Sequence, residues 1–192
     1  MKKIIVVGVG ALGSHVVQFV RSIPQIALTV IDDDRVEQKN VSSQFHPKQA
    51  VGRGKVLALQ QTMSFLFSRR MVTVPHRLTS DNVETLLKDA DLLVDCLDNA
   101  EARGLVQRYA RRHEVACVHG ALAADGSFGR VIWDGQFHID QEPGEGAPTC
   151  ENGEHLPFIA ATAAHLALAI QRHLDDGAEV GFTLHPGGVT AT

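Results

Sequence analysis

The sequence predicts an α/β fold built on a doubly wound, mostly parallel sheet, with antiparallel strands in its C-terminal part. A β-branched run over 3–7 ends in a glycine-rich turn and leads into a helical segment, which is typical of a buried parallel strand. Short apolar runs then alternate with amphipathic segments, and this alternation favours parallel strands joined by right-handed crossovers. An Asp125-Gly126 turn before the run 128–133 predicts a strand that returns antiparallel.

The individual elements follow from hydrophobic periodicity and from residues that begin or end helices, such as the candidate N-cap Ser80. The expected strands cover 3–7, 27–31, 72–74, 91–96, 115–119, 128–133 and 180–184. The expected helices cover 11–21, 55–70, 81–88, 100–113 and 156–174. All of them belong to a single nucleotide-binding domain spanning 1–192, with a polar, Gly/Pro-rich loop at 140–156.

The composition is that of an ordinary globular domain, and it excludes two classes of protein. A chain of 192 residues buries roughly 70% of its unfolded surface, so it needs neither disulfides nor a metal to fold. The net charge of −4 and the single Trp and Tyr argue against nucleic-acid binding, which uses basic patches and stacking platforms. No apolar stretch approaches the ~20 residues of a membrane span. We therefore expect no nucleic-acid and no membrane partner.

Cysteine usage and the N-terminus predict a cytoplasmic location. Cys96, Cys117 and Cys150 are odd in number and widely spaced, so they indicate neither a disulfide framework nor a zinc site. A reducing compartment fits this pattern. The apolar run at the N-terminus is too short for a signal peptide and continues directly into glycines, so we interpret it as a strand.

A glycine motif follows the first expected strand. Gly8, Gly10 and Gly13 form G-x-G-x-x-G between a strand and a helix, the context of a Rossmann-like phosphate cradle. The first glycine permits the tight turn, the second lets a phosphate approach the backbone, and the third lets the helix pack on its strand. The helix N-terminus offers free N–H groups to the anion. Asp32, 19 residues after Gly13, ends the second strand and is placed to accept hydrogen bonds from ribose hydroxyls.

A nicotinamide dehydrogenase is the default interpretation of this motif, but the residues that follow favour another family. The series runs Asp32-Asp33-Asp34-Arg35-Val36, Asn40, Gln44, Gly52-x-x-Lys55, Asp95-Cys96-Leu97-Asp98-Asn99 and Arg103. It resembles the ThiF/MoeB/HesA family, the bacterial relatives of ubiquitin-activating enzymes, from Met1 to about Leu174. The family pattern is D-x-D-x-V, N-x-x-R-Q, G-x-x-K and D-x-x-D-N-x-x-x-R, and this combination is far more specific than the glycine motif.

The resemblance implies an adenylyltransferase. In that family a carboxylate attacks the α-phosphate of ATP, and an acyl-adenylate forms as pyrophosphate leaves. The carboxylate is usually the C-terminus of a ubiquitin-like or sulfur-carrier protein, and a small-molecule carboxylate is the alternative substrate. The implied cofactors are ATP and Mg²⁺, and the implied nucleotide-binding residues are Gly8, Gly10, Gly13, Asp32, Asp34, Gln44, Lys55, Asp98 and Asn99.

The chemistry of three residues supports these roles. Lys55 opens a helix and can reach phosphates as a point charge. Asp98 follows a buried parallel strand at the edge where ligands bind, and a hard carboxylate there suits Mg²⁺. Asn40 can orient a phosphate oxygen or the attacking carboxylate. The alternatives are a solvated Lys55 and an Asp98-Asn99 pair that only caps the next helix. We expect Arg103 to be structural and to pair with an acid.

Two departures from the family pattern bear on activity. Ser43 stands where the family has the arginine that contacts the terminal phosphates, and Arg35, Arg53 or a partner subunit are the candidate substitutes. The paired C-x-x-C motifs of many members are absent, so we predict no structural zinc. His119, which ends a strand, is assigned to core packing, as are Cys96 and Cys117.

Cys150 and the helix 156–174 raise two further questions. In sulfur-transferring and conjugating members, a cysteine at about the place of Cys150 forms a covalent bond to the activated carrier, and an idle thiol is the alternative. The helix 156–174 is apolar around much of its circumference, which predicts a homodimer unless both sides pack within one domain. Two other functions stay open: the scaffold half of a heterodimeric activating enzyme, which Ser43 favours, and an NAD-dependent oxidoreductase, which leaves Lys55 and Asp98 unexplained.

Overall fold

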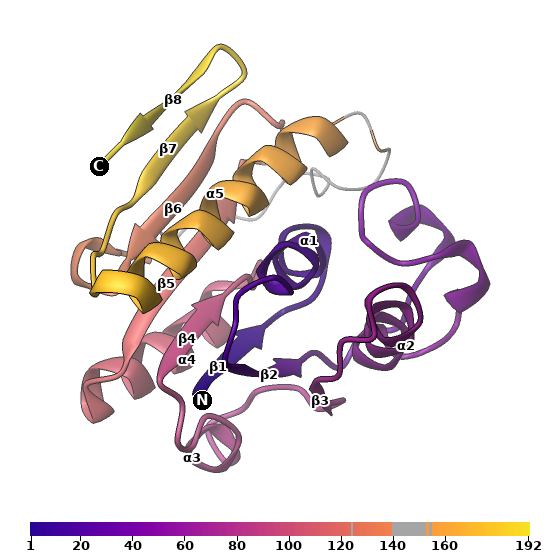
Figure 1. The fold of residues 1–192 in the computed structure, drawn as a ribbon, viewed down its shortest axis with the longest axis horizontal. Helices are drawn as coiled ribbons and strands as arrows, with labels where there is room; N and C mark the ends of the chain where they lie inside the picture. The colour runs from indigo at the N-terminus through magenta and orange to yellow at the C-terminus, as the bar shows by residue number, and fades with distance from the viewer. Residues whose placement is uncertain (124, 140–152, 154) are drawn as a thin grey trace.

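The computed structural model describes residues 1–123, 125–139, 153 and 155–192. Figure 1 shows a central sheet with helices on both faces. The elements are, in chain order, β1 (Lys2–Val7), α1 (Ala11–Val20), β2 (Ile26–Ile31), η1 (Gln38–Asn40), η2 (Lys48–Ala50), α2 (Lys55–Phe67), β3 (Val72–Val74), α3 (Val83–Leu86), β4 (Leu92–Asp95), α4 (Ala100–His113), β5 (Ala116–Leu122), β6 (Gly129–Trp133), η3 (Asp134–Gln136), α5 (Leu156–Asp176), β7 (Phe182–His185) and β8 (Gly188–Ala191).

The sheet has eight strands in the order β3-β2-β1-β4-β5-β6-β7-β8. The first five strands of that order are parallel, and β6, β7 and β8 are added antiparallel. This confirms the predicted α/β class and its antiparallel C-terminal strands. The direction of winding reverses between β1 and β4, and ligands of doubly wound sheets bind outside the carboxyl ends of the strands at such a reversal.

Two apolar layers hold the helices to the sheet. The larger layer joins α1, α2 and α5 to one face, and its fully buried members include Val16, Leu59 and Leu166. The smaller layer joins α3 and α4 to the other face through residues such as Leu87 and Val106. Central strands that are covered on both faces read as continuous apolar runs, which is why β1 and β4 could be predicted from the sequence.

The structure differs from the predicted boundaries most clearly at four places, and the other element ends shift by at most two residues. Helix α2 stops at Phe67, not at residue 70, because Ser68 adopts a left-handed conformation with φ of 53° that ends the helix. Helix α3 covers only Val83–Leu86, and Asn82 replaces Ser80 as its N-cap residue. Strand β5 continues to Leu122 because β6 pairs with its end, through Leu122 and Gly129. Strand β8 was not predicted, and it completes a hairpin with β7.

Two glycines let α1 approach the sheet closely. Gly8 has a φ of +86°, and a Cβ built on it would lie 2.8 Å from the carbonyl oxygen of Cys96. A Cβ on Gly13 would lie 1.9 Å from the carbonyl oxygen of Gly8. Real Cβ atoms do not come this close to backbone, so both positions require glycine. The first turn of α1 therefore packs against the ends of β1 and β4.

A Gly13→Ala substitution should lower the free energy of unfolding by about 2 kcal/mol or more, because backbone must move to make room for the new methyl group. The expected change is opposite in sign to the usual effect, because alanine in place of glycine inside a helix normally raises the free energy of unfolding by roughly 1 kcal/mol. Urea denaturation measures the difference. Gly135→Ala is the matched control, since a Cβ added there would have no atom within 4 Å. Equal stability of Gly13→Ala and the wild type would contradict the steric argument.

Candidate functional site

The glycine loop between β1 and α1 leaves an open helix N-terminus. The first backbone bond within α1 runs from Ser14 N–H to the carbonyl of Gly10, so the N–H groups of residues 11–13 precede it. Within the described residues, no side chain caps this helix. A Cβ on Gly10 would meet only the Gln44 amide, at 3.9 Å. Free N–H groups beside open space are the features that a phosphate requires.

Asp32 ties the glycine loop to the end of β2. Its Oδ2 accepts a hydrogen bond of 2.8 Å from the Val9 amide, and its Oδ1 accepts one of 2.8 Å from the Asp34 amide. Burial raises the pKa of Asp32, and the charge of Lys55 opposes this rise. A carboxylate can accept about four hydrogen bonds, so two further bonds from ribose hydroxyls can be accommodated.

Lys55 lies at the first position of α2 and is 7% exposed. Its Nζ is 2.7 Å from Asp34 Oδ2. Burial alone would lower the pKa of Lys55, but the carboxylates of Asp32, Asp34 and Asp98 outweigh it and raise that pKa. Lys55 therefore remains an ammonium ion at neutral pH, surrounded by acids from the ends of two strands. The alternative of a solvated lysine is excluded by its burial.

The sequence left open whether Asp98 and Asn99 bind a cation or only cap the next helix. Asn99 is the N-cap of α4, and its Oδ1 accepts a 2.8 Å hydrogen bond from the Ala102 amide. Asp98 is exposed at the carboxyl edge of the sheet, close enough to Lys55 to raise its pKa. The capping role thus belongs to Asn99, which leaves the Asp98 carboxylate available for a cation.

The loop over 37–46 brings Gln44 to the glycine loop. Asn40 is buried, and its Oδ1 accepts a 2.8 Å hydrogen bond from the Glu37 amide within a capping box around η1. Gln44 is also buried, and its Oε1 has no hydrogen-bond partner among the described residues. Asn40 therefore uses its side-chain oxygen to order the loop, while the Gln44 amide keeps an acceptor unused beside Gly10.

Three residues that sequence reasoning missed, Ser14, His15 and His46, fasten this loop to α1 and to the glycine loop. The Phe45 amide donates to Ser14 Oγ at 2.9 Å, His15 Nε2 donates to the Ser43 carbonyl at 3.0 Å, and His46 Nε2 donates to the Val9 carbonyl at 3.0 Å. Burial lowers the pKa of both histidines. One sequence signal indicates these contacts between α1 and the loop. Residues 14 and 15 are adjacent polar residues on a short helix whose other residues are mostly apolar.

The arginine position of the family is filled by a small, fully buried side chain, Ser43. Both candidate substitutes are exposed and form local hydrogen bonds. Arg35 donates to the Gly52 carbonyl at 2.7 Å, and Arg53 donates to Gln61 Oε1 at 2.5 Å. Each arginine therefore has one guanidinium donor engaged in a local contact.

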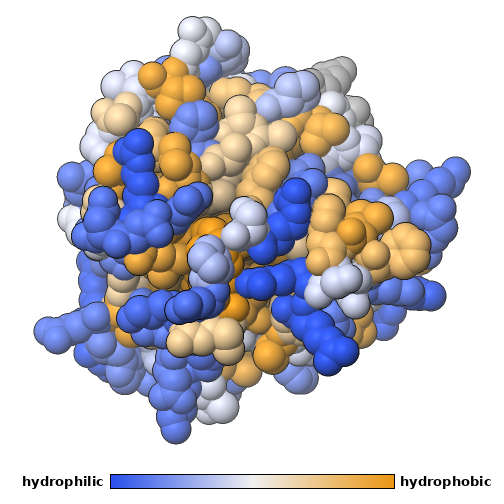
Figure 2. Space-filling model, viewed as in Figure 1, coloured by the Kyte–Doolittle hydropathy of each residue, from blue (hydrophilic) through white to orange (hydrophobic). Residues whose placement is uncertain are grey.

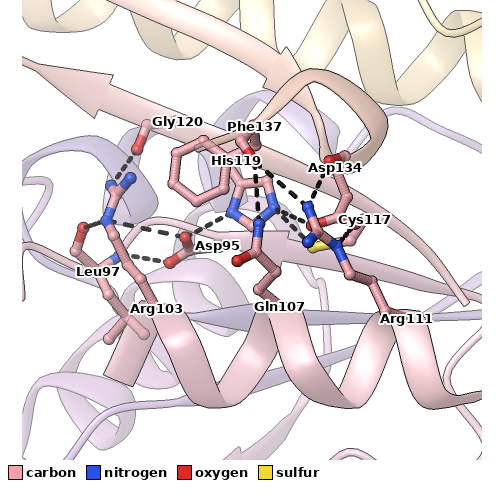
Figure 3. A network of polar contacts seen from close by, with 10 residues as sticks. All are labelled: Asp95, Leu97, Arg103, Gln107, Arg111, Cys117, His119, Gly120, Asp134 and Phe137. Carbon is pink, nitrogen blue, oxygen red and sulfur yellow. Dashed lines mark hydrogen bonds and ion pairs between the residues drawn. The ribbon is translucent and has the colours of Figure 1, made fainter. Parts of the chain in front are cut away.

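A buried polar network lies beside the Asp95–Asp98 turn and under α4 (Figure 3). His119 Nδ1 is 2.8 Å from Asp95 Oδ2, and His119 Nε2 is 3.3 Å from Asp134 Oδ1. Arg103 Nε is 3.8 Å from Asp95 Oδ2, which confirms its predicted pairing with an acid. His119 is fully buried, as its assignment to the core implied.

The cysteines of the described residues are not nucleophiles. Cys117 Sγ lies 3.5 Å from His119 Nε2, an arrangement with a superficial likeness to a thiol–imidazole pair. Burial raises the pKa values of the Cys117 and Cys96 thiols, so both remain protonated and unreactive. Cys150 lies outside the described residues, and its role as a covalent thiol stays a prediction.

His46 should make the fold sensitive to acid. Burial, with a smaller contribution from the Lys55 charge, lowers the pKa of His46 to about 4, whereas an unfolded histidine titrates near 6.5. The stability that the neutral ring contributes is complete above pH 6.5 and is lost as the pH falls towards 4, by roughly 3 kcal/mol in total. His46→Gln keeps a donor for Val9 and should flatten this part of the profile.

Urea denaturation at a series of pH values between 7 and 4 measures that profile. The exposed His138→Gln is the matched control and should keep the wild-type slope. An unchanged slope in His46→Gln would show that another group causes the acid sensitivity.

Comparisons with known proteins agree with this geometry. A model of the ThiF family matches residues 1–180. The SAMP-activating enzyme E1 of Haloferax volcanii is 29% identical over 185 residues, which is 91% of this chain and 68% of that protein. The sulfur carrier protein adenylyltransferase of Thermus thermophilus is 33% identical over 142 residues, covering 73% and 49%. The molybdopterin-synthase adenylyltransferase of Escherichia coli is 27% identical over 182 residues, covering 86% and 70%.

Solved structures share the fold at low sequence identity. A structure of E. coli MccB with MccA-N7isoASN has a TM-score of 0.81 at 14% identity and covers 100% of this chain and 63% of that one. E. coli TcdA, a tRNA N6-threonylcarbamoyladenosine dehydratase in complex with ATP, has a TM-score of 0.68 at 19% identity, covering 90% and 86%. The chain spans 41% to 68% of the length of the first three curated relatives. With the family model matching nearly all of its length, the chain belongs to the ThiF family.

Proposed function

We propose that this protein is an ATP-dependent adenylyltransferase that activates a carboxylate as an acyl-adenylate. The observation that carries the proposal is the charged, buried Lys55 among Asp32, Asp34 and Asp98, at the same sheet edge as an open glycine loop. Curated relatives are named as adenylyltransferases for a sulfur-carrier protein and for molybdopterin synthase. The proposed substrate is the C-terminus of a ubiquitin-like or sulfur-carrier protein, or a small-molecule carboxylate.

The residues suggest how the reaction proceeds. The N–H groups at the start of α1 bind the phosphates of ATP, and Asp32 accepts hydrogen bonds from the ribose. An oxygen of the substrate carboxylate forms a bond to the α-phosphorus. The bond from that phosphorus to the bridging oxygen breaks, and its electron pair leaves with pyrophosphate. Lys55 stabilises the charge that develops on the phosphate oxygens. Asp98 is an exposed, hard oxygen ligand suited to Mg²⁺, which when bound supplies further charge neutralisation.

Two observations separate this proposal from an NAD-dependent oxidoreductase. Hydride transfer leaves the buried Lys55 ammonium ion, held among three carboxylates, and the exposed Asp98 carboxylate without an evident role. A structural neighbour with the same fold is in complex with ATP. The scaffold half of a heterodimer is the second candidate, and it is favoured by one specific observation: Ser43 is buried, and Arg35 and Arg53 bond elsewhere. Pyrophosphate exchange by the protein alone distinguishes an active enzyme from a scaffold.

We also propose that the protein is a homodimer of the cytoplasm. Much of the apolar surface of α5 packs within the chain, against α1 and the sheet, so the wide apolar arc alone does not demand a partner. Figure 2 shows apolar residues that remain on the surface along α5. An open hollow of about 270 Å³ lies between α1 and α5, and half-exposed Leu168 lines it with Phe19 and Ile23.

Within the described residues, no helix combines the length and hydropathy needed to cross a bilayer.

Asp32→Ala should weaken ATP binding at least about tenfold, because the variant loses the ribose acceptor and frees the Val9 amide. Calorimetry with ATP and Mg²⁺ measures the affinity. The matched control is Asp33→Ala, which removes a neighbouring exposed carboxylate. Binding of NAD in place of ATP would contradict the proposed nucleotide.

Asp98→Ala should reduce ATP–pyrophosphate exchange by a factor of roughly 100 or more while the protein stays folded, because the cation loses its protein ligand. Lys55→Ala should be similarly severe. Exchange of labelled pyrophosphate into ATP, with candidate carrier proteins and small carboxylates as substrates, gives the rate. Glu101→Ala is the control, since it removes an exposed carboxylate three residues away in the first turn of α4. Near-normal exchange by Asp98→Ala would rule out its metal role.

A further inference from the structure

We propose that His46 is a positioning residue for the phosphate-binding loop, and that it orients the Val9–Gly10 peptide so that the Gly10 N–H faces a bound phosphate. This role rests on the proposed function, in which the glycine loop binds the phosphates of ATP. The contact that carries it is the hydrogen bond of 3.0 Å between His46 Nε2 and the Val9 carbonyl oxygen. A carbonyl oxygen can only accept, so Nε2 is the donor.

The geometry of the peptide bond turns this contact into a direction for the Gly10 amide. The peptide bonds of the described residues are trans. A trans peptide is planar, and its C=O and N–H point to opposite sides of the chain. Because the Val9 carbonyl points to His46, the Gly10 N–H points away from His46. Within the part of the chain that the structure describes, this N–H has no hydrogen-bond acceptor. It is therefore a further free donor beside those at the start of α1.

The neighbouring peptides of the glycine loop are held by other parts of the fold. On one side, the Val9 N–H donates to Asp32 Oδ2 at 2.8 Å. On the other side, the Gly10 carbonyl accepts a hydrogen bond of 3.1 Å from the Ser14 N–H. The Val9–Gly10 peptide lies between these two fixed points. Among the described residues, His46 is the hydrogen-bond partner that holds it.

Glycine at position 10 makes such an anchor necessary. A peptide plane can rotate by about 180° through changes in ψ of Val9 and φ of Gly10, and glycine adopts φ values of either sign about equally readily. Gly10 has a φ of −75° here. In the rotated state, the Val9 carbonyl oxygen would replace the N–H next to the phosphate and would repel it. The glycine that leaves room for a phosphate thus also permits an orientation that repels one, and the bond from His46 opposes that rotation.

The surroundings of His46 suit this role. The residue is 4% exposed, so water does not compete for the Nε2 donor. Its Nδ1 atom is buried and has no partner among the described residues. An apolar side chain would avoid this unpaired acceptor, so the Nε2 donor is what histidine adds here. Burial lowers the pKa of His46 to about 4, and the charge of Lys55 adds to this effect. At neutral pH the uncharged ring therefore acts on a phosphate through the peptide and not through a charge of its own.

Glycine-selective ¹⁵N labelling tests the Gly10 donor directly in the folded wild-type protein. The Gly10 signal is the one absent from Gly10→Ala, a substitution with room for its Cβ. We expect the Gly10 amide to shift when ATP binds, and the shift to be at least about twofold smaller in His46→Leu. The Gly8 N–H donates to Ile31 within the sheet, so its signal in the free proteins should stay close to its wild-type position. A Gly10 amide that does not respond to bound ATP in the wild type would overturn the proposal.

Calorimetry with ATP and Mg²⁺ measures the effect on affinity. His46→Leu removes the donor and should weaken binding at least about fivefold, whereas His46→Gln keeps a donor and should bind within about twofold of the wild type. His15→Leu is the matched control, because it removes a bond of equal length, 3.0 Å to the Ser43 carbonyl, from the same loop. It should also bind within about twofold of the wild type. If His46→Leu fails to fold, His46→Phe replaces it, since phenylalanine keeps a buried ring without a donor.

The outcomes separate this role from a merely structural one and from the proposed function. Equal losses of affinity in His46→Leu and His15→Leu would show that His46 only fastens the loop, and would overturn the proposal. Unchanged ATP affinity in a folded His46→Leu would also overturn it, while the proposed function stood. If the wild type bound ATP through Gly10 but exchanged no pyrophosphate with any carboxylate substrate, the proposed function would fail and the role of His46 would stand.

Discussion

The close contact between the first turn of α1 and the ends of β1 and β4 determines where every other part of the site lies. Gly8 and Gly13 permit this contact, because neither position has room for a Cβ. With α1 packed against these strand ends, the Val9 amide donates a hydrogen bond to Asp32. Ser14 and His15 then form hydrogen bonds with the loop that carries Gln44. A steric requirement at two glycines thus becomes an ordered set of hydrogen-bond donors around an open anion-binding position.

Charge is distributed unevenly across the carboxyl edge of the sheet, and the distribution suits phosphoryl chemistry. Lys55 is a buried cation among three carboxylates, so it is already desolvated and oriented before a nucleotide arrives. Charges that are already oriented stabilise a transition state without a reorganisation cost. The two arginines nearest to the missing family position are instead exposed and locally bonded. The buried cation of the candidate site is therefore a lysine, and a buried serine, Ser43, stands where the family pattern has an arginine.

The strands and most helices could be predicted because buried parallel strands are continuous apolar runs and glycines mark the turn between β1 and α1. The extent of α2 could not, since only the left-handed conformation of Ser68 ends it. Strand β8 was missed because its four exposed residues lack an apolar pattern. The residues of the family motif lie together at the carboxyl edge of the sheet, as the motif predicts. The contact of His46 with Val9 and the pairing of His119 with Asp134 depend on tertiary packing, so the local sequence carries no signal for them.

The strand order also links this site to the folding of the whole domain. Strand β4 pairs with β1, although Leu92 lies 88 positions after its partner Ile4 in the sequence. The segment from β1 to β2 carries the glycine loop and Asp32, but the Asp98 side of the candidate site comes from β4, which lies next to β1 in the sheet. A ligand that touches both sides binds only the completed sheet, so it stabilises the native state by RT ln(1 + [L]/Kd), an amount that grows with the free ligand concentration. Saturation with such a ligand thus protects the entire domain against unfolding, including strands far from the site.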